Sequence, residues 1–290
     1  MIFSGLSGAI ATTCIYPLAI TKTKLQNESG LTRSSPFQMM AAIWRDGGAK
    51  GFYRGWPPNV LFVMPEKALK LTMNDFFKRG MKERGIGVNG TTGELTMAAE
   101  MAAGGMAGTV QVVATNPMEL LQIQGATMAD RVQRGQLTAA ISYPRLVRDL
   151  GVSGLYTGVL ATLARDIPFS MLYFSMYSQF KHQLLADHSS TNLAFKSFAA
   201  GAAAGTLAAA LTCPMDVIKT RVHAAAVPVR LGWTEFVRRE VSMWTVHASG
   251  IVRSEGVGAL FRGVVPRCAI ISPLFGLTMT CYEEFQQRFG

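Results

Sequence analysis

The chain has 290 residues and a formal net charge of +10; 49% of its residues are hydrophobic and only 16% are charged. Soluble domains carry ~25% charged residues, so this composition, with a mean hydropathy of +0.22, argues against a soluble protein. The basic residues form no runs and no RNA-binding or zinc-finger motif occurs, so we expect an anionic membrane surface or substrate as partner, and no nucleic acid.

No pattern in the chain indicates catalysis or metal binding. The four cysteines are isolated and the four histidines lack the spacing of a zinc site, so we predict no metal and no cofactor. We find no nucleophile–base pair and no phosphate-binding loop, so we expect no enzyme. The apolar start "MIFSGLSGAIATTCIY" lacks a basic region and its pattern recurs later, so we interpret it as a structural segment that is kept.

Three landmarks recur in one order with a period of about 100 residues. The first is a proline followed by charged residues, in "YPLAITKTKLQ", "NPMELLQIQG" and "CPMDVIKTRV". The second is a glycine-rich element, "DGGAKGFYRG", "DLGVSGLYTG" and "EGVGALFRG". The third is another proline, at Pro65, Pro168 and Pro273. We therefore predict three repeats, at residues 1–88, 89–188 and 189–290.

Each repeat is predicted to contain two long helices, each able to supply the ~20 residues that cross a bilayer. We expect these helices at residues 1–27, 56–83, 93–125, 159–185, 192–223 and 264–288. Every odd helix carries a pair of small residues that lets helices approach closely in lipid. The pairs are Ser4 and Gly8, Gly104 and Gly108, and Gly201 and Gly205. Amphipathic connectors such as "SPFQMMAAIWRDGG" are expected along the membrane surface, and "VRLGWTEFVRREVSMW" predicts an additional surface helix.

Some charges fall inside the predicted spans. They are Glu66, Lys67, Lys70, Arg165, Asp166 and Arg267. Charges at membrane depth are costly and normally face a bundle interior or a water-filled path. A soluble all-α protein is the alternative, but the charges are too few to cover its surface. We predict an all-α integral membrane protein with six transmembrane helices in three pseudo-threefold repeats and short amphipathic surface helices.

A first ring of charge is predicted where the odd helices continue past their prolines. Residues two and five positions after each proline are Ala19 and Lys22, Glu119 and Gln122, and Asp216 and Lys219. Prolines kink helices, so three kinked helices around one axis would converge at these residues. Pairing each acid with the base of the next repeat gives Glu119–Lys219 and Asp216–Lys22. Pairing each acid with the base of the previous repeat instead would leave charges unpartnered, which is costly in a converging bundle.

A second ring is predicted near the far ends of the even helices. Its residues are Asp75 and Lys78, Ser178 and Lys181, and Glu283 and Gln286. The same rule predicts the pairs Asp75–Lys181 and Glu283–Lys78. Ion pairs that face water contribute only ~0–1 kcal/mol each, so two such rings suit two gates around a central site. Static salt bridges at helix ends are the alternative.

These motifs resemble the mitochondrial carrier family, whose repeats carry Pro-x-acid-x-x-base-x-base and then acid-Gly and aromatic-base-Gly. The resemblance covers essentially the whole chain and implies six transmembrane helices and multi-pass solute transport in the mitochondrial inner membrane. It implies that the first ring is the matrix gate, braced by Gln26, and that the second is the cytoplasmic gate. Ala19, Gln122 and Thr157 depart from the pattern, and we expect the missing ion pair in each ring to weaken its gate.

Three stretches resemble the glutamate and aspartate/glutamate carriers of this family: "PEKALKLTMNDFF", "RDIPFS" and "RCAIISPLFG". The chemistry agrees, because Arg165 can hold a carboxylate through paired hydrogen bonds while Asp166 takes an ammonium group. A second carboxylate needs a second cation, from Arg267, Lys67 or Lys70. Glu66 is the expected proton carrier, and Phe62 and Ile270 occupy contact positions of the family.

Each of these assignments has a structural alternative. Arg165 and Asp166 would also suit a purely structural ion pair. Glu66 and Lys70 would suit an ordinary i, i+4 helix pair. Arg267 would suit a side chain that reaches to the membrane interface. With these alternatives open, we predict a monomeric importer of L-glutamate with a proton, in contact with membrane lipid including cardiolipin. Aspartate/glutamate exchange and a non-transporting membrane scaffold remain the competing functions.

Overall fold

The computed structural model describes residues 2–27, 36–53, 56–90, 93–133, 143–186, 193–225, 231–261 and 263–289. For residues 2, 22–27, 36, 58, 62, 122–133, 143, 185–186, 224–225 and 289 the description is confined to the backbone. The side chains of Lys22, Gln26 and Gln122 therefore lie outside the described part of the protein.

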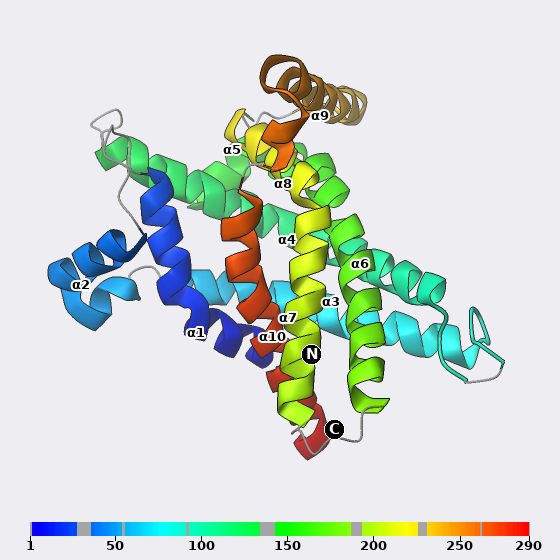
Figure 1. Ribbon diagram of the computed structural model, residues 1–290. Helices are drawn as coiled ribbons and strands as arrows, with labels where there is room; N and C mark the ends of the chain where they lie inside the picture. The colour runs from blue at the N-terminus through cyan, green and yellow to red at the C-terminus, as the bar shows by residue number, and fades with distance from the viewer. Residues whose placement is uncertain are drawn as a thin grey trace.

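The described chain is almost entirely helical (Figure 1), which confirms the all-α fold class. The long segments are α1 (Ile2–Asn27), α3 (Trp56–Glu83), α4 (Met97–Gln133), α6 (Val159–Ala186), α7 (Leu193–Leu211) continued by α8 (Cys213–Ala225), and α10 (Val264–Phe289). The connectors form α2 (Pro36–Phe52), α5 (Tyr143–Leu155) and α9 (Trp233–Glu255), and a 3-10 turn, η1 (Val257–Phe261), precedes α10. The additional surface helix expected in the third connector corresponds to α9.

The long helices form a closed ring. α1 packs on α3, α4 on α6 and α7 on α10, and these hairpins meet through α3 with α4, α6 with α7 and α1 with α10. The last contact includes stacked rings of Phe3 and Phe285, with centroids 5.9 Å apart. Both chain ends accordingly lie toward the lower end of the bundle in Figure 1.

The predicted small residues draw the two helices of every hairpin together. At the position nine residues before each odd-helix proline, a Cβ atom added to the glycine would lie 2.6 to 3.2 Å from a side chain of the facing helix. The glycines and the residues they face are Gly8 and Lys67, Gly108 and Ser170, and Gly205 and Phe275. Each facing residue comes two positions after the even-helix proline of its own repeat. The same close approach of two helices, which favours helix association in lipid, therefore occurs three times.

The third and fifth long helices differ from the expectation. The third ends at Gln133 rather than at residue 125, and it begins at Met97 rather than at residue 93, because Val88 and Leu95 form an isolated antiparallel bridge ahead of it. Gly93 adopts φ 66°, which a residue with a side chain rarely adopts. The predicted proline kink divides only the fifth long helix into two, at Thr212 between α7 and α8, whereas α1 and α4 continue through their prolines.

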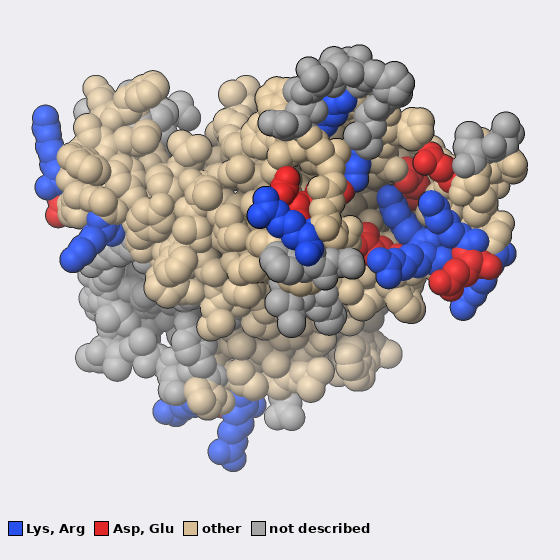
Figure 2. Space-filling model, turned by 90° about the horizontal axis from the view of Figure 1, so that it is seen from below, with Lys and Arg blue, Asp and Glu red and all other residues tan. Residues whose placement is uncertain are grey.

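The outward faces of the odd helices are apolar, as expected for contact with lipid. Examples are Leu6 and Ile10 of α1, Val110 and Val113 of α4, and Leu207 and Leu211 of α7. Within the described ranges, hydropathy and length alone mark three membrane spans, Phe3–Thr21, Leu193–Leu211 and Val257–Arg288. α3, α4 and α6 are also long enough to span a membrane, but charged residues that face inward, such as Asp166, lower their hydropathy. From below, the described surface is mostly uncharged and its charges gather in patches (Figure 2).

Candidate substrate site and gates

Arg165 and Asp166 lie next to each other on α6, inside the ring of helices. Arg165 Nη2 donates a hydrogen bond to Oδ2 of Asp166 at 2.9 Å, and Asp166 is buried. Nη1 of Arg165 also lies 3.8 Å from Oδ1 of Asp216 in α8. Arg267 of α10 lies closer to this aspartate, with its Nη1 2.6 Å from Oδ2. One carboxylate of the first ring is therefore shared by two arginines of the predicted substrate site, which the sequence did not indicate.

α3 contributes an acid and two lysines to the same interior. Lys67 Nζ lies 3.2 Å from Oε1 of Glu66 and 5.0 Å from the ring centroid of Phe275. Lys70 is 3% exposed, and its Nζ lies 5.0 Å from the ring centroid of Phe169. Both lysines thus make cation–π contacts with other helices of the ring, Lys67 with α10 and Lys70 with α6. The ion pair of Glu66 is with Lys67 rather than with Lys70, so the i, i+4 alternative is wrong.

Two cavities adjoin these charges. The central cavity, of about 130 Å³, lies between α3, α4 and α6 and is bordered by Glu66, Gln111, Thr115, Glu119, Arg165 and Asp166. A second cavity, of about 180 Å³, lies between α1, α3 and α10, and Glu66, Lys67 and Ile270 border it. Glu66 therefore reaches both spaces. Charged groups of both signs surround a volume that small polar molecules can occupy.

The first ring forms one of its two predicted ion pairs within the described residues. Lys219 Nζ lies 2.6 Å from Oε1 of Glu119, which joins α8 to α4 in the predicted sense. The predicted partner of Asp216 is Lys22, whose side chain lies outside the described part. The bracing residue Gln26 lies outside it as well.

The pairing predicted for the second ring is not formed in this structure, in which this end of the bundle is open. Neither Asp75–Lys181 nor Glu283–Lys78 forms. Lys181 Nζ instead lies 2.5 Å from Oε1 of Glu283. Here an acid pairs with the base of the previous repeat, and not with that of the next. Lys78 Nζ lies 3.0 Å from Oε1 of Glu100, an acid near the start of α4. These four ring residues therefore lie at one end of the bundle but are not joined in the predicted circle.

Tyrosines and Glu100 explain this difference. Tyr282 donates its hydroxyl proton to Asp75, and Tyr177 donates to Glu283 at 3.0 Å. Asp75 thus has a partner other than Lys181, while Glu100 provides one for Lys78. The repeat pattern covers only the six ring positions and does not include these neighbours.

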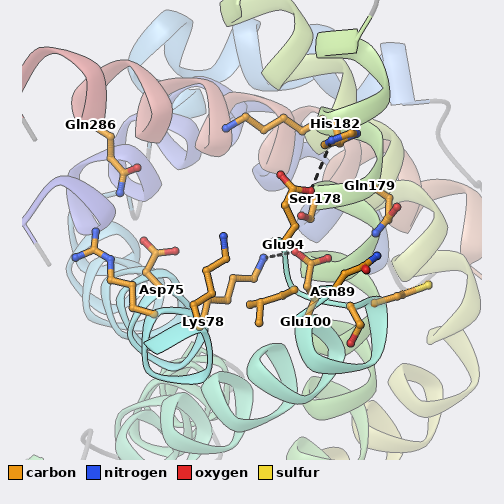
Figure 3. Close-up of a pocket in the computed structure, with 15 residues that line it drawn as sticks. Asp75, Lys78, Asn89, Glu94, Glu100, Ser178, Gln179, His182 and Gln286 are labelled. Atoms are coloured by element: carbon orange, nitrogen blue, oxygen red, sulfur yellow. Dashed lines mark hydrogen bonds and ion pairs between the residues drawn. The ribbon is translucent and has the colours of Figure 1, made fainter. Parts of the chain in front are cut away.

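The second ring opens into a wide cavity of about 770 Å³, which we call the mouth cavity. Asp75, Lys78, Ser178, Lys181 and Gln286 of the ring line it, as does Glu100. In Figure 3 the dashed line from Lys78 runs to Glu100, away from Gln286 on α10. This end of the bundle therefore contains a charged, water-accessible space.

Two functional candidates were missed by the sequence argument, Glu100 and Gln111. They share one face of α4 with Gly104, Gly108 and Thr115, because these residues follow one another at intervals of three or four. The small-residue pair already marked this face as the one toward α6. Polar residues in register with it could therefore have been assigned to the interior.

Comparison with known proteins agrees with this geometry. The sequence model of the family "Mitochondrial carrier protein" matches residues 1–85, 93–188 and 190–290. Mitochondrial substrate carrier family protein X of Dictyostelium discoideum is 37% identical over 98% of this chain and 89% of its own length. The human mitochondrial glutamate carrier 1 is 35% identical over 97% of this chain and 91% of its own length.

A human mitochondrial electrogenic aspartate/glutamate antiporter is 37% identical over 98% of the chain, which spans only 40% of the antiporter. The closed ring of helices, the charged interior and these matches define a membrane transporter of the mitochondrion. The chain belongs to the mitochondrial carrier family. Members of this family are transporters rather than enzymes.

Proposed function

We propose that this carrier imports L-glutamate, together with a proton, across the mitochondrial inner membrane as a monomer in contact with cardiolipin-containing lipid. The observation that carries the proposal is the Arg165–Asp166 pair beside the central cavity, with Lys67, Lys70 and Arg267 in the same interior. A dicarboxylic amino acid needs two cationic partners and one acceptor, and this set provides them. The similarity to the glutamate carrier supports the same substrate.

Asp216 provides a way to couple substrate binding to the first ring. A substrate carboxylate that reaches Arg165 or Arg267 competes with the carboxylate of Asp216 for the same guanidinium groups. The side chain of Asp216 is 31% exposed, and ion pairs at partly exposed sites contribute only ~0–1 kcal/mol. Substrate binding can therefore release Asp216 and shift the balance between the two open states of the carrier.

Glu66 is the proposed proton carrier. It borders both interior cavities, so a proton can reach it along with the substrate. Its carboxylate lies 3.2 Å from Lys67, which favours the charged form. Protonation must therefore break this ion pair, and the freed ammonium of Lys67 would then be available to a substrate carboxylate.

The proposal is tested by uptake of labelled L-glutamate into proteoliposomes under a pH gradient. Arg165→Ala is expected to reduce uptake about thirtyfold or more, since losing one partner of a largely buried charge pair costs ~2–5 kcal/mol. Arg165→Lys retains the charge without the planar fork and should lose less. Arg148→Ala removes an exposed arginine of α5 and should transport normally. Undiminished uptake by Arg165→Ala would contradict the proposal.

Aspartate/glutamate exchange is the second candidate, favoured by the similarity to the antiporters. The same assay separates the two functions. An exchanger takes up external glutamate only when the vesicles contain aspartate or glutamate, whereas a symporter fills empty vesicles when the outside is acidic. A protein that transports under neither condition would be a membrane scaffold.

A further inference from the structure

Gln111 of α4 is a buried polar residue that borders the central cavity together with Arg165. Its side chain is 4% exposed. Its Nε2 donates to the hydroxyl of Thr115 at 3.3 Å, while its Oε1 has no hydrogen-bond partner. Buried polar atoms are usually paired, so a lone acceptor beside a cavity marks a place where a donor can bind.

The orientation of this amide follows from its neighbour. The Thr115 hydroxyl donates its one proton to the backbone carbonyl of Gln111 at 2.8 Å. The hydroxyl oxygen can then only accept from the side chain of Gln111, so the NH2 group must face it. The free atom of the amide is therefore the oxygen, which is an acceptor.

A second residue of the same cavity also carries an unpaired atom. Nε of Arg165 is buried and has no partner, although Nη2 of this residue is bonded to Asp166. Two residues that border the central cavity therefore carry unpaired atoms, a donor on α6 and an acceptor on α4. A ligand with a carboxylate and an ammonium group on one carbon has a partner for each.

We propose that Oε1 of Gln111 binds the ammonium group of the transported amino acid while Arg165 binds its α-carboxylate. Asp166, the ammonium ligand expected from the sequence, is already bonded to Arg165 at 2.9 Å, so its role is to orient the guanidinium. Glu66 is likewise engaged by Lys67. Gln111 is then the residue that distinguishes an amino acid from a plain dicarboxylate. This assignment rests on the proposed function.

The test compares two competitors of labelled L-glutamate uptake in proteoliposomes: unlabelled L-glutamate, and glutarate, which has the same carboxylates but no amino group. Gln111→Met keeps the length of the side chain and removes the acceptor. We expect it to weaken competition by L-glutamate about tenfold, the effect of losing a hydrogen bond to a charged group, and to change competition by glutarate less than twofold. Gln183→Met, the same change at an exposed position of α6, should alter neither.

Equal weakening of both competitors, or no change in either, overturns the assignment, because the cavity would then hold only water or serve packing. If Gln111→Met does not fold, Thr115→Val removes the anchor of the amide and should lower the same preference to a smaller extent. Wild-type vesicles that take up no L-glutamate would overturn the proposed function, and this assignment with it. Wild-type uptake with an unchanged preference in both variants would overturn the assignment alone.

Discussion

Asp216 lies between the substrate site and the first ring, because Arg165 and Arg267 both approach its carboxylate. Arg267 is almost fully buried and lies 2.6 Å from this acid, whereas Arg165 divides its charge between Asp166 and Asp216. A substrate that binds to these arginines therefore meets an internal competitor. The competitor is also a gate residue, so substrate occupancy and gate pairing are linked through one side chain.

Asp216→Asn tests this link, since it removes the competing charge and keeps the shape. L-glutamate should bind up to about fivefold more tightly, the factor that corresponds to an ion pair of ~1 kcal/mol, while the maximal rate falls because the gate acid is lost. The measurement is KM and maximal rate of uptake in proteoliposomes. Asp149→Asn, an exposed change on α5, is the control. Weaker binding of L-glutamate to the variant would contradict the competition.

At the scale of elements, close contact holds the two helices of each hairpin together. The surface helix α9 in addition fixes the start of α6. Glu240 of α9 is buried and accepts hydrogen bonds from the backbone N–H groups of Gly158 at 2.9 Å and Leu160 at 3.3 Å. These N–H groups lie at the N-terminus of α6, where a carboxylate is favourable. Burial nevertheless raises the pKa of the Glu240 carboxyl above its ordinary value. The third repeat thus holds the helix that carries Arg165.

Gly104→Ala is the sharpest test of hairpin packing. The added Cβ would lie 2.6 Å from the carbonyl oxygen of Ser170, a backbone atom that cannot move freely. We expect the free energy of unfolding to fall by ~1–3 kcal/mol, the usual cost of overpacking. Gly80→Ala in α3 is the matched control, because nothing lies within 4 Å of its added Cβ. Thermal unfolding in detergent should separate the two variants, and equal midpoints would refute the packing argument.

At the scale of the whole molecule, the threefold repetition made most of the architecture predictable. It located the long helices to within a few residues at most boundaries, identified the glycines at the hairpin contacts and predicted the ion pair Glu119–Lys219. The contacts of the second ring in this structure were not predicted, because Lys78 is bound by Glu100, a residue outside the repeated positions. The sharing of Asp216 was hidden for the same reason. Repetition predicts equivalent positions, but it does not predict which of several nearby partners a side chain selects.

The central claim is that charges from neighbouring repeats pair across an interior path for an amino acid. Glu119 and Lys219, whose charged atoms lie 2.6 Å apart, allow the most direct measurement: L-glutamate uptake by Glu119→Lys, by Lys219→Glu and by the double variant. Each single reversal places like charges in contact, so both should lose uptake, and the double reversal should restore a substantial part of it. Single variants that transport as well as the wild type, or a double variant as inactive as the single ones in protein of normal thermal stability, would contradict the account.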